Sequence, residues 1–206
     1  MPTILNVQSS PNLWASGSRA VSKAYIDAYV GAHPGTTVID VDLVANPPPH
    51  FGPDHLRGFF TPPDTHEPAN AAAVAESEAY IAQVMQADVI VLGTPMHNFG
   101  IASTMKSWID NIVRIGVTFK YTEAGLVVGL VPAAKKLVIV VGSGGVYSEG
   151  PYAAFEYAGR YLRDTLGTIG LTDSTILRAE GMTMGPDMAA KGMADGIASA
   201  TALAMA

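Results

Sequence analysis

The sequence predicts an α/β protein in which a doubly wound, five-stranded parallel sheet carries helices on both faces. The first observation is that short apolar runs alternate along the chain with longer segments whose apolar residues recur at helical spacing. The second is that the run at 88–93 is continuously apolar, as expected for a parallel strand buried on both faces. The third is that no apolar stretch reaches the length of a membrane span.

Five segments are expected as strands because they are apolar or β-branched: 3–8, 36–41, 88–93, 136–141 and 171–177. Five others have helical spacing or helix-forming composition: 16–31, 69–86, 101–112, 151–166 and 186–206. Segment 117–130 is extended in character, and its pattern leaves its form open.

The length of 206 residues, with 49% hydrophobic residues, indicates one domain spanning 1–206. Segment 46–68 is different, since it holds seven of the 14 prolines and shows little periodicity. We interpret it as an ordered excursion over the surface and not as a domain boundary.

Charge and composition exclude several classes of function. A formal net charge of −6 without a basic run argues against nucleic acid or an anionic membrane as partner. The absence of cysteine excludes disulfides, thiolate metal sites and thiol catalysis. No signal-like leader precedes the first apolar run, so a soluble, cytoplasmic protein is expected. No metal site is expected, because His50, His55 and His66 lie in irregular chain and are interpreted as solvated loop residues.

In a sheet of this kind, ligands bind beyond the carboxyl ends of the strands, which directs attention to three loops. The loop at 9–19 follows a strand and opens a helix, whose free N–H groups and dipole suit an anion. Ser10, Ser16 and Ser18 add hydroxyl donors, and Gly17 permits close approach of backbone. Neither the G-x-G-x-x-G fingerprint nor a P-loop is present. The alternative is a serine-rich turn in which Ser16 is only a helix N-cap.

The other two loops could hold a flat heteroaromatic ring. The loop at 94–100 places apolar and polar side chains directly after a buried strand. The alternative is an ordinary turn that caps the next helix, which would have the same sequence pattern. The loop at 142–147 contains three glycines, which allow main chain to approach a ligand. Together the three loops predict a mononucleotide site, with the phosphate at the first loop and the ring between the other two.

Six stretches, in order along nearly the whole chain, carry a resemblance to a known family. They are Ser9-Ser10, Ser16-Gly17-Ser18, Pro95-Met96-His97-Asn98-Phe99, Lys106-Ser107-Trp108-Ile109-Asp110, the run Gly-Val-Thr-Phe-Lys-Tyr-Thr at 116–122, and the segment 181–186 with the helix after it. In these motifs the sequence resembles the FMN-dependent NADH-azoreductases, also called FMN-dependent NADH:quinone oxidoreductases.

The resemblance implies a flavodoxin-like fold with strand order 2-1-3-4-5, and a homodimer with two tightly bound FMN molecules near its interface. It implies that the phosphate is held by Ser10, Ser16, Gly17 and Ser18. The isoalloxazine would lie against Pro95, Met96, His97, Asn98 and Phe99, with its polar edge at Gly142, Ser143, Gly144 and Gly145. The family usually has tyrosine at the position of His97 and arginine at that of Ser143. Backbone contacts there would preserve FMN binding, whereas the flavin potential and substrate preference would differ.

The implied activity is ping-pong hydride transfer. NADH or NADPH would reduce the flavin at N5, and a quinone or aromatic azo compound would then take the same place and accept the hydride. Because the flavin carries the chemistry, no catalytic side chain is assigned. Phe60 and Tyr121 are candidates for the substrate wall, with core or dimer packing as the alternative. Two other functions stay open: a one-electron carrier of the flavodoxin type, and a flavin-free regulatory or structural protein.

Overall fold

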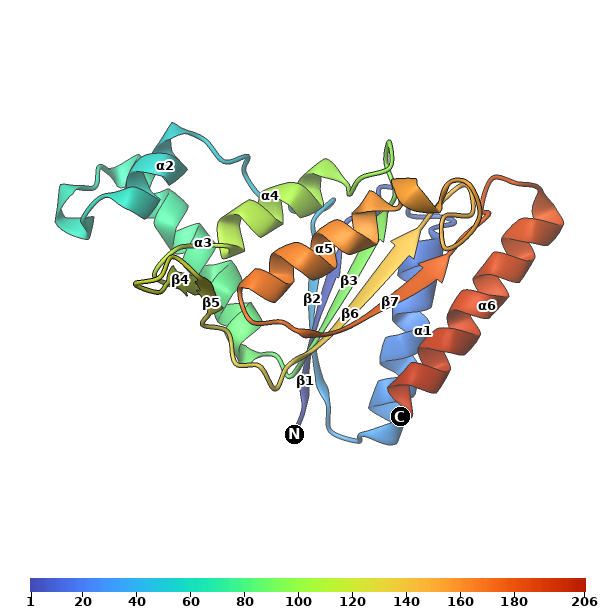
Figure 1. The fold of residues 1–206 in the computed structure, drawn as a ribbon. Coiled ribbons are helices and arrows are strands. Elements are labelled where there is room, and N and C mark those ends of the chain that lie inside the picture. Colours follow the sequence, from blue (N-terminus) through green and yellow to red (C-terminus); the bar gives the residue numbers. More distant parts are fainter.

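The computed structural model describes all residues from 1 to 206 and has three layers, with one parallel sheet between two layers of helices (Figure 1). The sheet order is β2-β1-β3-β6-β7, which confirms the predicted order 2-1-3-4-5. Its strands are β1 (Thr3–Gln8), β2 (Thr37–Asp42), β3 (Val89–Pro95), β6 (Lys136–Gly142) and β7 (Asp173–Ala179). All four pairings are parallel, so the carboxyl ends of the strands meet at one edge of the sheet.

Helices cover both faces of the sheet, because alternate strand side chains point to opposite faces and each face carries a core. Helices α1 (Gly17–Ala32) and α6 (Pro186–Ala204) pack over a smaller core that contains Ile4, Val91 and Val138. Helices α3 (Pro68–Gln86), α4 (Ser103–Ile112) and α5 (Tyr157–Thr168) cover a larger core around Leu5, Ile90 and the fully buried Trp108. The helix and strand boundaries agree with the prediction to within two residues, except at the start of α5.

Helix α5 begins later than predicted because a side chain caps it at Glu156. The carboxylate of Glu156 accepts a hydrogen bond of 2.7 Å from the Gly159 N–H, which fixes the first turn there. Pro151, predicted at the helix start, lies in a turn before the short 3-10 helix η2 (Ala153–Phe155). Proline suits both positions, so its presence did not distinguish them.

The two segments with unclear patterns lie together at the left of Figure 1. The proline-rich excursion contains helix α2 (Pro53–Phe60) and one 3-10 turn, η1 (Pro63–Thr65). Segment 117–130 forms an antiparallel pair, β4 (Phe119–Tyr121) and β5 (Val127–Gly129). The expectation that His55 is solvated is wrong: it is 6% exposed, and its ring packs against Phe51 and Phe59, at 5.6 and 5.9 Å between ring centroids.

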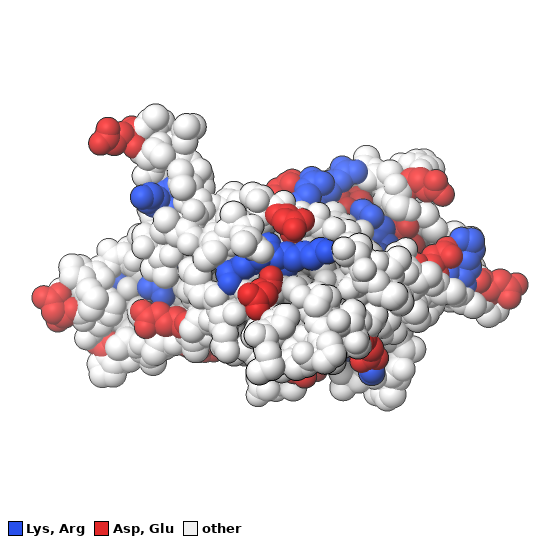
Figure 2. Space-filling view, turned by 90° about the horizontal axis from the view of Figure 1, so that it is seen from below, with Lys and Arg blue, Asp and Glu red and all other residues white.

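The surface carries charges of both signs. On the face shown in Figure 2, acidic and basic side chains are interspersed among larger areas of uncharged surface. Short ion pairs such as Lys23–Asp27 and Lys191–Asp195 link residues four apart on the helices. No helix combines the length and apolarity needed to cross a membrane.

Replacing Tyr25 by phenylalanine is expected to leave the free energy of unfolding at pH 7 unchanged or higher. Tyr25 is fully buried and its hydroxyl has no hydrogen-bond partner. Burial disfavours the phenolate and raises the pKa of Tyr25 from 10.0 to about 12, so ionisation costs the wild type no stability below pH 10 and costs progressively more as pH rises from 10 toward 12. Urea unfolding at pH 7 and pH 11 measures both effects: the variant should lose less stability at pH 11 than the wild type. Tyr152→Phe, at an exposed tyrosine, is the control, and a clear loss for Tyr25→Phe at pH 7 would contradict the assignment.

Candidate functional site

The loops at the carboxyl edge of the sheet surround a cavity of about 220 Å³. All the predicted cofactor residues line it except Asn98, Phe99 and Gly145. The full lining consists of Ser10, Pro11, Asn12, Ala15, Ser16, Gly17, Ser18, Pro95, Met96, His97, Gly142, Ser143, Gly144, Met182 and Thr183. The set contains no lysine, arginine, aspartate or glutamate, so the cavity offers neutral donors, backbone and a helix end to a ligand.

The first loop places the start of α1 against the cavity. Ser16 is the N-cap, and its Oγ accepts a hydrogen bond of 3.2 Å from the Arg19 N–H. The Ser16 and Ser18 hydroxyl oxygens are 3.2 Å apart, and both residues line the cavity. An α-helix provides no internal partner for the N–H groups of its first turn. Ser16 therefore caps the helix and also lines the cavity, so the two interpretations of this loop are compatible.

The second loop holds two residues in left-handed backbone. Asn98 has φ of 48° and Phe99 has φ of 69°. His97 and Gly100 close this turn by exchanging two backbone hydrogen bonds of 2.9 Å. Left-handed backbone costs a residue with a side chain roughly 1–2 kcal/mol, and such strain tends to gather at functional loops. The turn is anchored to the third loop, because the Met96 N–H donates to the Gly142 carbonyl at 2.7 Å.

The third loop is tied to a fourth, which follows β7. Ser143 is 4% exposed and its hydroxyl donates to the Gly145 carbonyl at 2.9 Å. The backbone N–H groups of Met182 and Thr183 donate to the carbonyls of Ser143 and Gly144, at 3.1 and 3.0 Å. The sequence did not predict a cavity role for Met182 or Thr183, nor for Pro11, Asn12 and Ala15. The roles of Met182 and Thr183 could have been predicted, since their segment also follows the carboxyl end of a parallel strand, where ligands bind.

Two glycines allow the close approach that forms the cavity. A Cβ on Gly142 would lie 3.0 Å from the backbone nitrogen of Ser18. A Cβ on Gly17 would lie 2.7 Å from the Cβ of Ala179. The missing side chain at Gly142 therefore leaves a first-turn N–H of α1 open beside the cavity, which fits the phosphate of a mononucleotide. The volume is below the roughly 300–1,000 Å³ of a complete small-molecule site, so the cavity suits one end of such a ligand.

A second cavity, of about 590 Å³, lies between α2, α4, α5 and β4 and shares no residue with the first. It contains both predicted substrate residues, Phe60 and Tyr121, which are 63% and 55% exposed. The structure therefore brings these two residues together, but not into the cavity of the phosphate loop. Its walls are Phe51, Phe59, Phe60, Lys106, Ile109, Asp110, Val113, Arg114, Ile115, Phe119, Tyr121, Tyr161 and Thr165.

Arg114 is the most buried charge in the wall of the second cavity. It is 8% exposed, and its guanidinium carbon lies 4.3 Å from the centroid of the Phe59 ring. It donates to the Ser77 hydroxyl at 3.1 Å. Burial lowers the pKa of Arg114 from its ordinary value. The contact between Arg114 and Phe59 joins α2 to the segment just after α4.

The other histidines of the proline-rich excursion have structural contacts. His50 Nδ1 lies 3.0 Å from the Ser107 hydroxyl, and His66 Nε2 lies 3.1 Å from the Thr61 carbonyl. No group of three or more His, Asp or Glu side chains gathers where it could hold a metal ion. The His50 contact joins the proline-rich excursion to α4, and the His66 contact lies within the excursion.

The fold and the cavity define a flavodoxin-like protein, and a family model described as flavodoxin-like fold matches residues 2–203. An FMN-dependent NADH:quinone oxidoreductase of Herminiimonas arsenicoxydans is 44% identical over 194 residues, covering 94% of each chain. One of Mesorhizobium japonicum is 41% identical over 204 residues, covering 98% of this chain and 95% of the relative. The chain belongs to the family of FMN-dependent NADH:quinone oxidoreductases.

Solved structures support the assignment of the chain to this family. An azoreductase from Bacillus anthracis superposes with a TM-score of 0.90 at 34% identity, covering 100% of this chain and 99% of that one. An FMN-dependent NADH-azoreductase from the same species, solved in complex with FMN, gives a TM-score of 0.86 at 25% identity, covering 99% and 100%.

Replacing Gly142 by alanine is expected to weaken FMN binding about tenfold or more. The added methyl group would crowd the Ser18 N–H, and loss of one hydrogen bond to a charged group is worth about 1.5–3 kcal/mol. Titration of apoprotein with FMN, followed by flavin fluorescence, measures the change. Gly31→Ala is the control, because a Cβ there would meet nothing within 4 Å. Unchanged affinity in Gly142→Ala would contradict this phosphate position.

Proposed function

We propose that this protein is an FMN-dependent NADH:quinone oxidoreductase that also cleaves aromatic azo compounds reductively. The observation that carries the proposal is the cavity at the start of α1, where neutral donors surround the space that Gly142 leaves open. When bound, FMN supplies the redox chemistry, accepting a hydride from NADH and passing it to the acceptor in a second half-reaction.

The side chains and backbone of the loops would hold and orient the cofactor. The first turn of α1, with Ser10, Ser16 and Ser18, would bind the phosphate through neutral donors. The backbone of the other loops would meet the polar edge of the ring, with Met96 as an apolar contact. Each of these groups binds or orients, and none takes or gives a proton to the substrate in this proposal.

The assembly we propose is a homodimer in which a second copy completes the substrate site. The smaller cavity suits only one end of FMN, and the residues expected at the substrate wall lie in the larger, aromatic cavity. The β4–β5 hairpin beside that cavity exposes large apolar side chains, among them Leu126 and Val127, at 66% and 46%. Such a patch is expected to be covered by a partner. The proposal keeps the cytoplasmic location expected from the sequence.

The activity is tested on the purified protein. We expect a yellow preparation with one FMN per chain that NADH bleaches without oxygen and that benzoquinone or an azo dye reoxidises. The two-electron chemistry sets the stoichiometry: one NADH is consumed per quinone, and two per azo bond cleaved to two amines. Initial rates against both substrates should give the parallel lines of a ping-pong reaction. A flavin that NADH leaves oxidised would refute the proposal.

Replacing Val128 by lysine is expected to weaken the dimer, because the side chain is 39% exposed on β5 among other apolar groups. Sedimentation velocity should show monomer at concentrations where the wild type is dimeric, with loss of acceptor turnover. Ile197→Lys, at a similarly exposed residue on α6, is the control. A wild-type protein that is monomeric and fully active would show that the assembly is wrong while leaving the activity intact.

A further inference from the structure

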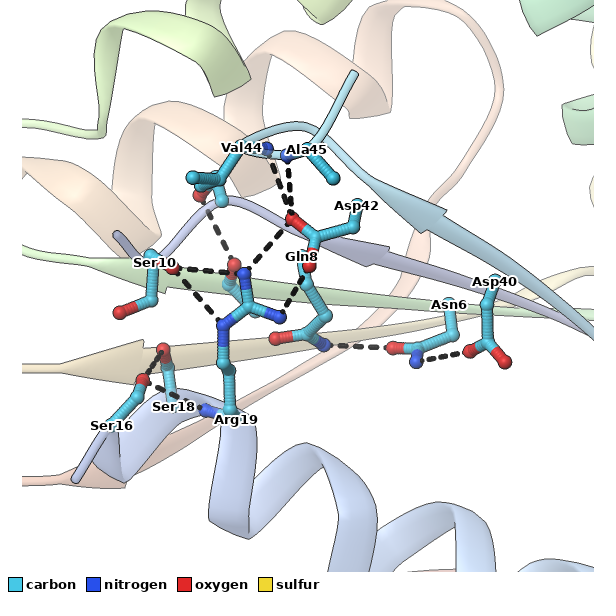
Figure 3. Close-up of polar contacts among 12 residues, drawn as sticks. Asn6, Gln8, Ser10, Ser16, Ser18, Arg19, Asp40, Asp42, Val44 and Ala45 are labelled. Atoms are coloured by element: carbon cyan, nitrogen blue, oxygen red, sulfur yellow. Dashed lines mark hydrogen bonds and ion pairs between the residues drawn. The ribbon is translucent and has the colours of Figure 1, made fainter. Parts of the chain in front are cut away.

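Arg19 connects two loops of the fold through four hydrogen bonds of one guanidinium group (Figure 3). Its Nε and Nη2 donate to the carbonyl oxygen of Ser10, at 3.0 and 2.9 Å. Its Nη1 and Nη2 donate to the two carboxylate oxygens of Asp42, at 2.9 and 3.0 Å. The pair is partly sheltered, with the Arg19 and Asp42 side chains 22% and 35% exposed.

Asp42 is itself fixed, so the guanidinium has a rigid support. Its Oδ1 accepts the Val44 N–H at 2.9 Å, and the neighbouring Leu43 N–H donates to the Gln8 carbonyl at 2.9 Å. The carboxylate therefore belongs to the turn after β2, which is hydrogen-bonded to the end of β1. Arg19 extends this support to the loop after β1.

Arg19 does not line the 220 Å³ cavity, whereas Ser10 does. In Figure 3 the Ser10 carbonyl faces the guanidinium of Arg19. The Ser10 hydroxyl points away from the guanidinium, toward the side where Ser16 and Ser18 lie. The charge of Arg19 is already paired with Asp42. Its position therefore suits fixing the Ser10 peptide and does not suit contacting an anion directly.

We propose that Arg19, held by Asp42, is a positioning residue that keeps the Ser10 carbonyl turned away from the phosphate site. The proposal rests on the proposed function, since it assumes that the cavity takes the phosphate of FMN. A carbonyl oxygen carries partial negative charge and repels a phosphate, so a cradle of neutral donors works only while its carbonyls point elsewhere. Without Arg19 the Ser10 carbonyl is a sheltered acceptor without a partner, and the peptide is free to turn.

The geometry requires arginine. Only its planar fork reaches both carboxylate oxygens and a carbonyl at once, whereas lysine offers a single point of charge. Arg19→Lys should therefore behave like Arg19→Met. A second prediction separates geometry from charge: the double variant Arg19→Met with Asp42→Asn restores local neutrality but not the hydrogen bonds to Ser10, so it should stay defective.

The experiment compares FMN with riboflavin, which has the same ring but no phosphate. Apoprotein is titrated with each flavin by fluorescence quenching at fixed pH and ionic strength. We expect Arg19→Met to raise the Kd for FMN about ten- to a hundredfold, the range for loss of a charge-assisted hydrogen bond, and to change the Kd for riboflavin by less than about twofold. Lys23→Met is the matched control, because Lys23 lies one turn further along α1 and pairs only with the exposed Asp27.

Several results would overturn the inference. Equal weakening of both flavins in Arg19→Met would indicate general loosening of the fold. Recovery of FMN affinity in Arg19→Lys or in the double variant would indicate that charge balance, and not the position of Ser10, is what Arg19 provides. If Arg19→Met does not fold, Arg19→Lys, measured beside Lys23→Met, still gives the comparison of FMN with riboflavin. Wild-type apoprotein that takes up no FMN would refute the proposed function itself, which distinguishes that failure from this one.

Discussion

The candidate site depends on the close approach of Gly142, at the end of β6, to the backbone nitrogen of Ser18 in the first turn of α1. The approach is possible because β1 and β6 are both hydrogen-bonded to β3, so their carboxyl ends and the loops after them lie side by side. The cavity, the tie from Met96 to Gly142 and the ties of the fourth loop to Ser143 and Gly144 are all built around this contact. A side chain at Gly142 would crowd the Ser18 backbone and Cβ at the centre of this arrangement.

Most of the fold follows from the sequence because buried parallel strands and amphipathic helices have strong periodic patterns. The same patterns locate the three loops, since each follows a predicted strand. Helix α2 was missed because proline-rich composition masks helical spacing, although Pro53 occupies the first turn, where proline is tolerated. Segment 117–130 could not be assigned because a three-residue strand is too short to show alternation. The left-handed backbone of Phe99 could not be predicted either, because an aromatic residue gives no local signal for it.

His97 and Ser143, the two positions where the family resemblance leads us to expect other residues, lie in loops joined by main-chain hydrogen bonds. The Ser143 hydroxyl is occupied by the Gly145 carbonyl, and its N–H by the Ala179 carbonyl. The backbone of His97 is paired with Gly100 in the closed turn. A loop whose shape is fixed by main-chain hydrogen bonds tolerates exchange of its side chains. In the proposed site, the side chains at these two positions would therefore affect the electrostatic surroundings of the ring more than its placement.

The absence of cationic residues in the cavity lining determines how the site can recognise a phosphate. A helix N-terminus and hydroxyl donors bind an anion through fixed directions, so their strength depends on geometry and less on local charge. Arg19, which contacts the cavity residue Ser10, is paired with Asp42, and this pairing holds the pKa of Asp42 below its usual range. In the proposed site, a chain with a net charge of −6 would thus present a phosphate with oriented dipoles, and Arg19 would keep those dipoles in place. On this proposal, selectivity for a phosphorylated flavin over an unphosphorylated one would depend on the rigidity of the loop that holds Ser10.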